Sequence, residues 1–368
     1  MKLHFDVALC VRAKSKFSTC TKCMDAAEGI VELQENLPSF KAGMGIEAAA
    51  CIGACPTEAF SLSDFSTTEF FFNFLDSKVR LISPKLNVPC ISVLSVEHLI
   101  SLALASDEPV VLDLASYEAG SSVLEIIRQR IEEANFVLSA FSEKRLETNS
   151  DEEISVASNA QETAPSRREF LSNASLKGAL KHKKAFDEAV EEGELQVFEI
   201  ADDVIAKIKD KHLPNKRKIL FTTLKHAGVP DVFEVLPEEE VSFTSQKFVD
   251  DGCTNCQMCY RVCPTGALST DKKFSLIHFD AMLCVKCHLC HDVCEPDAIH
   301  LQPGYEIKEF FEPTQRTLAA FEIKRCHECG NPFTYTGGEQ ICPRCMLEEE
   351  EAMVLHENAK KMRGENNG

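Results

Sequence analysis

The sequence has no long apolar run, and this absence bears on two kinds of segment. Stretches such as ISLALA at 100–105 fall far short of the roughly 18 apolar residues that a membrane-spanning helix needs. The opening residues, MKLHFDVALCVRAKSK, lack the uninterrupted apolar core of a secretory signal. We therefore expect neither membrane insertion nor export, and we predict a cytoplasmic location.

Basic residues are scarce relative to acidic ones. The chain has 39 Lys and Arg against 58 Asp and Glu, which gives a formal net charge of −19. Nucleic-acid phosphates bind to basic surfaces, so we expect no nucleic-acid partner. Negative charge around a redox centre favours a low reduction potential, because it repels the added electron. An acidic surface also steers basic protein partners toward the molecule.

Nucleotide-binding and catalytic motifs are missing as well. The segment 88–138 contains neither GxGxxG nor GxxxxGK, so no nucleotide site is predicted there. No Ser–His or Cys–His arrangement has a spacing that supports nucleophilic catalysis. The hydrophobic content of 44% and the charged content of 26% indicate a globular protein, and its length suggests two or three domains. We expect no enzymatic activity from the chain on its own.

The sequence is rich in cysteine, with 18 residues that cluster at metal-ligand spacings. Disulfides would be expected in a small secreted protein, but without an export signal metal binding is the better interpretation. Five cysteines lie in the first 62 residues and twelve lie between 243 and 346. The remaining one, Cys90, stands alone in an apolar stretch and is expected to be a small buried core residue.

The strongest motif is CTNCQMCYRVCPTGAL at 253–268, followed by CVKCHLCHDVCEPDAI at 284–299. Each has the spacing C-x2-C-x2-C-x3-C, in which one loop supplies three thiolates to a [4Fe–4S] cluster and the other loop supplies the fourth. The predicted ligands are Cys253, Cys256, Cys259 and Cys294 for cluster A, and Cys284, Cys287, Cys290 and Cys263 for cluster B. Two zinc knuckle pairs would leave the third cysteine of each loop idle.

This region resembles the bacterial two-cluster ferredoxins. The resemblance implies a small α+β unit with pseudo-twofold symmetry, whose clusters are close enough to exchange an electron. One departure is Glu295, which precedes Pro296 where the family often has proline directly after the last cysteine. It leaves the ligands intact.

Residues 1–62 fit the same template in part. The stretch ACIGACPTEAF at 50–60 repeats the ending CPTGAL, and EGIVEL and EAFSL are expected to be the strands that follow the two loops. Most ligands of a second site are missing, because their positions hold Gly45 and Ala48. We therefore predict a degenerate ferredoxin-like module with one [4Fe–4S] cluster on Cys10, Cys20, Cys23 and Cys55. Two alternatives stay open: Cys51 in place of Cys10, or zinc on these cysteines.

The stretch CHECGNPFTYTGGEQICPRC at 326–345 has the spacing C-x2-C-x12-C-x2-C. Two such knuckles form a closed tetrahedral thiolate site, the usual structural zinc site. An iron site of the rubredoxin type has the same ligands, but its pairs are usually further apart in sequence, so zinc is favoured. The predicted zinc ligands are Cys326, Cys329, Cys342 and Cys345.

A ferredoxin module followed by CxxCGxPF and a second CxxC is similar to the small iron–sulfur subunits of formate-hydrogenlyase-type complexes. The similarity implies electron transfer within or beside a larger oxidoreductase, such as a formate dehydrogenase or a hydrogenase. We predict an electron-transfer protein with three [4Fe–4S] clusters and one zinc ion, which carries low-potential electrons to or from a protein redox partner. The alternative is an assembly or maturation factor for an iron–sulfur or molybdenum/nickel oxidoreductase.

The predicted fold class is α+β with several domains. Segment 63–146 has a βαβ-like pattern, with strands at 88–95 and 109–115 and helices at 95–106 and 121–138. The predicted parts are a degenerate ferredoxin-like module at 1–62, an α/β-like region at 63–146, an acidic flexible linker at 147–166, a mainly helical region at 167–242, the dicluster domain at 243–303, a zinc-ribbon-like segment at 304–346 and a charged helical tail at 347–368.

Overall fold

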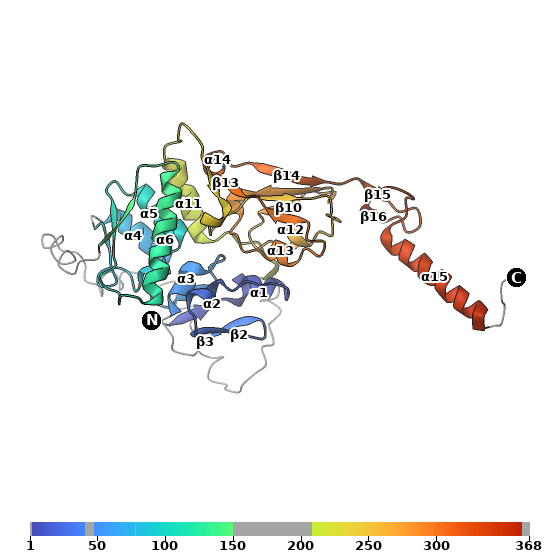
Figure 1. Cartoon of the computed structure of the whole chain (residues 1–368), viewed down its shortest axis with the longest axis horizontal. Helices are drawn as coiled ribbons and strands as arrows, with labels where there is room; N and C mark the ends of the chain where they lie inside the picture. Colours follow the sequence, from blue (N-terminus) through green and yellow to red (C-terminus); the bar gives the residue numbers. More distant parts are fainter. Residues whose placement is uncertain (1, 41–47, 78, 150–207, 363–368) are drawn as a thin grey trace.

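The computed structural model describes residues 2–40, 48–77, 79–149 and 208–362, and all structural statements below concern these residues. They form a mixed α/β structure in which the first 62 residues lie beside the last third of the chain (Figure 1). The α/β region of the middle segment also packs against the N-terminal residues (Figure 1).

The N-terminal region pairs its strands in a nested order. Strand β1 (Leu3–Phe5) is antiparallel to β4 (Phe60–Leu62), and between them β2 (Val31–Gln34) is antiparallel to β3 (Leu37–Phe40). Glu35 and Asn36 both have positive φ values, 50° and 68°, as a two-residue type I′ turn requires. The other elements are η1 (Val7–Leu9), α1 (Val11–Lys14), α2 (Lys22–Ala26) and α3 (Ala50–Ala54). The strands predicted from EGIVEL and EAFSL are thus present as β2 and β4.

The dicluster region repeats this nested order. Strand β9 (Lys247–Val249) is antiparallel to β12 (Ile299–Leu301), and β10 (Leu268–Thr270) is antiparallel to β11 (Leu276–Asp280). Helices α12 (Met258–Val262) and α13 (Leu289–Asp292) follow the two cysteine loops, and η5 (Ala281–Leu283) leads into the second loop. Strand β14 (Gln315–Ala320) extends the inner hairpin by pairing with β11.

The middle segment contains a parallel sheet in the order β5-β6-β7. Its strands are β5 (Leu81–Ile82), β6 (Val110–Asp113) and β7 (Leu146–Asn149), joined by α5 (Val96–Ala105) and α6 (Ser122–Ser139). Helix α4 (Thr67–Asp76) precedes the sheet and buries Phe70, Phe71 and Phe74. The predicted helices and the second predicted strand are therefore present, and the segment has the βαβ connectivity.

The predicted strand at 88–95 is wrong. This stretch contains the short helix η3 (Ile91–Val93), and the first strand of the sheet is β5 instead. The backbone groups of the stretch find partners outside a sheet: Ile91 N–H donates to the Tyr117 hydroxyl, and Arg130 donates to the carbonyls of Ser92 and Leu94. A buried apolar run satisfied by side chains needs no strand neighbour.

The linker predicted at 147–166 begins too early, because its first three residues belong to β7. Its remainder, and the part of the predicted helical region up to 207, lie outside the described residues. The described end of that region contains α11 (Asn215–His226), β8 (Val235–Pro237) and η4 (Glu238–Glu240). Helix α11 packs on α5, and β8 pairs with β13 (Gly304–Glu306), which is followed by α14 (Lys308–Phe311).

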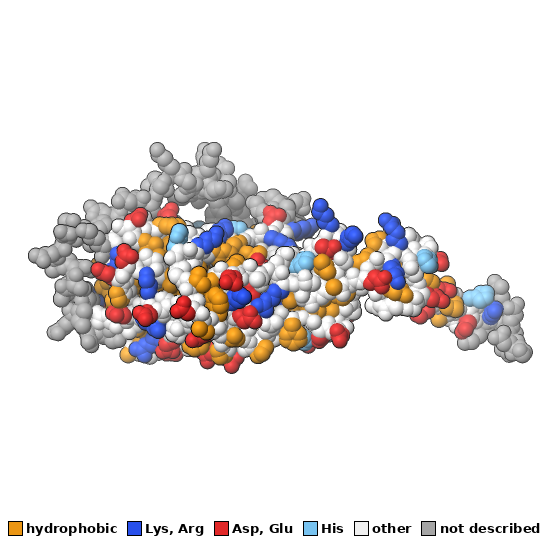
Figure 2. Space-filling model, turned by 90° about the horizontal axis from the view of Figure 1, so that it is seen from above, with side chains coloured by type: hydrophobic (Ala, Val, Ile, Leu, Met, Phe, Trp, Pro, Cys, Tyr) orange, Lys and Arg blue, Asp and Glu red, His pale blue; other side chains and the backbone are white. Residues whose placement is uncertain are grey.

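The C-terminal part projects from the body as an arm. It consists of the hairpin of β15 (Ile323–Arg325) and β16 (Pro332–Thr334), followed by α15 (Pro343–Met362). Figures 1 and 2 show this arm from two directions, and in both it points away from the rest of the molecule. Among the described helices, none is both long enough and apolar enough to cross a membrane.

Candidate metal centres

The two crossed cysteine sets of the dicluster region line two separate cavities. One cavity is bordered by Cys253, Cys256, Cys259 and Cys294. The other is bordered by Cys263, Cys284, Cys287 and Cys290. Each cavity thus combines three cysteines of one loop with the last cysteine of the other.

The two loops reach this arrangement with the same backbone. Asn255 and Gln257 have positive φ values of 54° and 73°, and Lys286 and His288 have values of 46° and 60°. These residues occupy equivalent places, two positions after the first cysteine and one position after the second. Left-handed residues of this kind are uncommon outside glycine, so their recurrence at matched positions marks a constrained loop.

The turns after the last cysteine of each motif share a second geometry, and the turn after Cys55 has it too. The third residue after the cysteine has positive φ in all three cases: Glu58 (55°), Gly266 (79°) and Asp297 (49°). A backbone amide then donates to the cysteine sulfur, from Ala59 to Cys55 at 3.3 Å, from Leu268 to Cys263 at 3.5 Å and from Ala298 to Cys294 at 3.2 Å. Such N–H groups stabilise a thiolate.

The five N-terminal cysteines come together, but not equally. Electrostatic interactions link every pair among Cys10, Cys20, Cys23 and Cys55. Cys51 interacts electrostatically with Cys23 and Cys55, and its thiol donates to the carbonyl oxygen of Cys23 at 3.2 Å. Cys51 is fully buried in α3.

Burial and mutual repulsion oppose ionisation of these thiols when no metal is bound. Burial raises the pKa of Cys10 to about 11 and that of Cys51 to about 12, and Cys55 adds to both shifts. In the dicluster region burial likewise raises the pKa of Cys259 and of Cys290 to about 12. Since metal ligation requires thiolates, loading of these sites must release protons.

The N-terminal cysteines lie next to the second dicluster cavity. Val11, Leu289 and Val293 form one small buried cluster, and Cys20 and Cys287 both pack against it. Lys14 from α1 also interacts electrostatically with Cys263 and Cys287. Two cysteine sites from opposite ends of the chain are therefore separated by a few apolar side chains.

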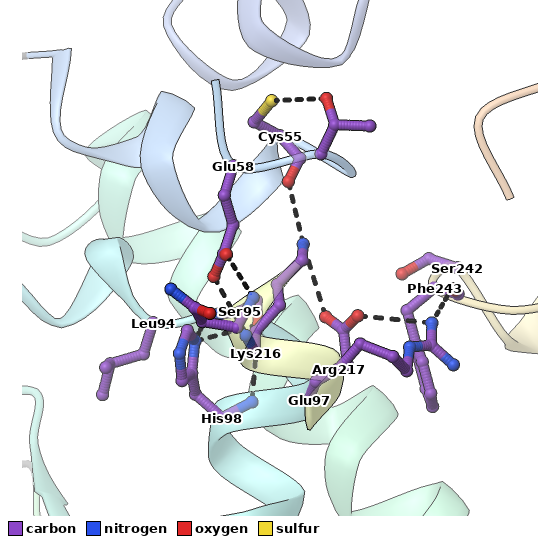
Figure 3. Close-up of polar contacts among 12 residues, drawn as sticks. Cys55, Glu58, Leu94, Ser95, Glu97, His98, Lys216, Arg217, Ser242 and Phe243 are labelled. Carbon is purple, nitrogen blue, oxygen red and sulfur yellow. Dashed lines mark hydrogen bonds and ion pairs between the residues drawn. The ribbon is translucent and has the colours of Figure 1, made fainter. Parts of the chain in front are cut away.

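A lysine from a third part of the chain reaches the N-terminal site, and sequence reasoning missed it. Lys216, in α11, donates from Nζ to the carbonyl oxygen of Cys55 at 2.8 Å and lies 3.5 Å from Glu97 (Figure 3). Glu58 accepts hydrogen bonds from the amides of Asn215 and Lys216, at the start of the same helix. A lysine in an ordinary helical stretch carries no sequence signal of such a role.

The four C-terminal cysteines form a group in which the sulfur atoms are closely spaced. The sulfur atoms of Cys326, Cys329, Cys342 and Cys345 all lie within 4.8 Å of one another. The sulfurs of Cys329 and Cys342 are 3.7 Å apart. Ligands at about 2.3 Å from one tetrahedral ion are about 3.8 Å from each other, so the group could bind a single metal ion.

Among the described residues this is the one group of histidine, cysteine and carboxylate side chains with such close spacing. No three cysteines of the N-terminal region or of either dicluster cavity are this close to one another. Burial opposes ionisation of Cys326, but N–H groups of Cys329 and Cys342 outweigh it and lower its pKa to about 6.

Comparison with known families identifies one part of the chain. Residues 252–299 match the family model of the 4Fe-4S dicluster domain. No curated protein matches the chain closely enough to count as a relative. The match and the cysteine arrangement support a ferredoxin-like iron–sulfur protein, in which a ferredoxin-like 4Fe–4S domain is part of a mixed α/β structure.

Proposed function

We propose that this protein is an electron carrier with three [4Fe–4S] clusters, two in the dicluster domain and one in the N-terminal region. The observation that carries the third cluster is the Cys-Pro turn. Cys55 has the same positive-φ residue three positions later and the same N–H···S hydrogen bond as Cys294. Iron–sulfur clusters exchange single electrons, and the match at 252–299 supports this chemistry.

The third cluster is assigned to Cys10, Cys20, Cys23 and Cys55. These four interact electrostatically in every pairing. The hydrogen bond from Cys51 to the carbonyl oxygen of Cys23 gives this thiol a structural role beside the site. Zinc on the same four residues is disfavoured, because their sulfurs do not have single-ion spacing.

The three clusters would form one electron-transfer path rather than two separate redox sites. Cluster B and the N-terminal cluster would face each other across Val11, Leu289 and Val293. Clusters A and B would be neighbours, since α12 and α13, the helices that follow their loops, pack on each other. The apolar cluster and the packing of α12 on α13 would hold these sites at fixed positions relative to one another.

The C-terminal arm is assigned a structural zinc ion. The group at 326–345 is closed, with four cysteines and no position left for a substrate, so it would hold the β15–β16 hairpin against the start of α15. An arm held in this way is a suitable place for a partner protein to bind.

We further propose a cytoplasmic protein whose partner is a formate dehydrogenase, a hydrogenase or a similar oxidoreductase. The acidic composition favours low potentials and partners with basic surfaces. A role in assembly or maturation of such an enzyme remains the second candidate. Stable clusters with reversible low potentials support the carrier, and transfer of a labile cluster to a metal-free client supports the assembly factor.

The test is a count of iron, acid-labile sulfide and zinc per chain in anaerobically purified protein. Three cubanes and one zinc site predict about twelve iron, about twelve sulfide and about one zinc. About eight iron with two zinc would contradict the N-terminal cluster and confine electron transfer to the last third of the chain.

A further inference from the structure

A cavity of about 150 Å³ lies where the N-terminal region, the α/β region and the dicluster domain meet. Four cationic side chains line it, and each comes from a different part of the chain. They are Lys22 of α2, Arg130 of α6, Lys216 of α11 and Lys286 of the second cysteine loop. Only one acidic residue, Glu97, shares the lining. Figure 3 shows the wall of this region around Lys216, Glu97 and Arg217.

The cations are held in place mainly by neutral groups. Arg130 donates to the carbonyls of Ser92, Leu94 and Ala50 at 2.5, 3.0 and 3.0 Å. Carbonyl oxygens orient a guanidinium, but they do not neutralise its charge. Burial lowers the pKa of Arg130 to about 10, so it is still charged at neutral pH.

The nearby carboxylates leave an excess of positive charge. Glu97 is shared between Lys216 and Arg217, and Glu238 pairs with Lys286. Glu133 is engaged by Ser242, which also lines the cavity, and burial raises the pKa of this carboxyl. The Lys22 side chain is exposed; its backbone amide donates to the sulfur of Cys20, and its charge interacts electrostatically with the same cysteine. In the lining itself four cations face one carboxylate, in a protein whose net charge is −19.

The start of α5 adds partial positive charge to the same cavity. Ser95, Val96 and Glu97 line it, and they are the N-cap and the first two residues of this ten-residue helix. In the capping box, the amide of Ser95 donates to the side chain of His98, and the amide of His98 donates to the side chain of Ser95. Among the described residues, the amides of Val96 and Glu97 have no acceptor and are available to an anion.

We propose that this junction cavity binds a small tetrahedral oxyanion with two negative charges, of the phosphate or sulfate type. The volume suits an ion of this size with a few waters and is below the roughly 300–1,000 Å³ of pockets that hold larger organic ligands. The excess of positive charge in the lining favours an anionic ligand.

A bound oxyanion would also act on the redox centres, a consequence that rests on the proposed clusters. Lys22 precedes Cys23, and Lys286 lies between Cys284 and Cys287. A dianion at this place would oppose reduction of the N-terminal cluster and of cluster B, and reduction would in turn weaken anion binding by the same factor.

The primary test is calorimetric titration of the full-length, iron-loaded protein with sulfate and with phosphate, against potassium chloride at matched ionic strength. We expect one site per chain for the oxyanions and none for chloride. Lys22→Gln should weaken binding about tenfold, because it removes one charge and is exposed enough to leave the fold intact. Lys218→Gln, an exposed position on α11 outside the cavity, makes the same charge change and should leave the affinity unaltered.

The outcomes test the anion site and the proposed clusters separately. Absence of saturable sulfate and phosphate binding, or equal weakening by Lys22→Gln and Lys218→Gln, would overturn the site and leave the cations as counter-charges for the clusters alone. Where binding is found, potentiometric titration should show lower midpoint potentials with oxyanion. A tenfold affinity difference between oxidation states corresponds to about 59 mV. Binding without any shift would overturn the redox coupling, and neither result depends on the number of clusters.

Discussion

Thr19 donates two hydrogen bonds to the carboxylate of Asp292, from its amide at 2.9 Å and from its hydroxyl at 2.8 Å, although 273 positions separate the two residues. Thr19 directly precedes Cys20, and Asp292 follows Cys290 in α13. The pair lies beside the apolar contact of Val11 with α13 and ties the N-terminal site to the second cysteine loop. The proposed electron path depends on this attachment.

Replacing Asp292 with alanine should loosen the attachment without removing a cysteine. Two hydrogen bonds to a carboxylate at a partly exposed place contribute about 1–3 kcal/mol together. We expect faster amide hydrogen exchange across 10–23 and weaker magnetic interaction between the reduced N-terminal cluster and cluster B, measured by electron paramagnetic resonance. Asp107→Ala removes the same charge at an exposed site in the α/β region and should change neither quantity. Unaltered exchange and coupling in Asp292→Ala would show that the apolar contact alone holds the two parts together.

Substitutions of Cys10 and Cys51 decide the ligand set of the N-terminal cluster. Cys10→Ser should remove a ligand, so that iron falls from about twelve to about eight atoms per chain. Cys51→Ser should retain the iron, because its hydroxyl can still donate to the carbonyl oxygen of Cys23. The measurement is iron and sulfide analysis together with the spectrum of the reduced protein. The opposite result, loss of iron in Cys51→Ser with retention in Cys10→Ser, would establish the alternative set.

Local patterns made some of these features predictable from the sequence. The ligands of the dicluster region could be assigned because each loop carries three cysteines within seven positions, and the crossed fourth ligand follows from a recurring template. Cys10 could be predicted only with Cys51 as an open alternative, since ten positions separate Cys10 from Cys20 and no local rule fixes such a loop.

Long-range contacts explain why the remaining predictions from the sequence were wrong. The apolar run at 88–95 resembles a buried strand, yet its carbonyls are taken by Arg130, a residue of α6. Polar residues at 147–149 resemble a linker, yet they pair with β6 in parallel. Periodicity describes which side chains are buried and cannot show which distant group satisfies the backbone.

Gly53 is expected to be necessary for the packing of α3. A Cβ atom at this position would lie 2.6 Å from the carbonyl oxygen of Ser92 and 2.8 Å from that of Leu94, and it would overlap the guanidinium of Arg130. Alanine favours a helix by about 1 kcal/mol over glycine, but overpacking of this kind typically destabilises by about 1–3 kcal/mol. We therefore expect Gly53→Ala to lower the free energy of unfolding, measured by urea titration. Gly228→Ala, where the added Cβ meets nothing within 4 Å, is the control and should have little effect. A stabilised Gly53→Ala protein would mean that α3 can move away from η3 freely.

His98 is expected to make the protein less stable as the pH falls below neutral. Its Nδ1 accepts a hydrogen bond from the amide of Ser95, and its Nε2 is buried without a partner among the described residues. Burial lowers its pKa from 6.5 to about 4; Lys216 and Arg130 act in the same direction, and Glu97 opposes them.

Because the unfolded chain binds the proton more readily, stability conferred by neutral His98 is present above pH 6.5 and is lost as the pH falls toward 4. The loss attributable to this residue between pH 7 and pH 5 is about 2 kcal/mol. His98→Gln keeps an acceptor for the Ser95 amide and removes the titration, so the free energy of unfolding should depend less steeply on pH in this variant. Urea titrations of both proteins at pH 7 and pH 5 give the difference, and identical pH dependence would mean that His98 takes up its proton in the folded protein as easily as in the unfolded chain.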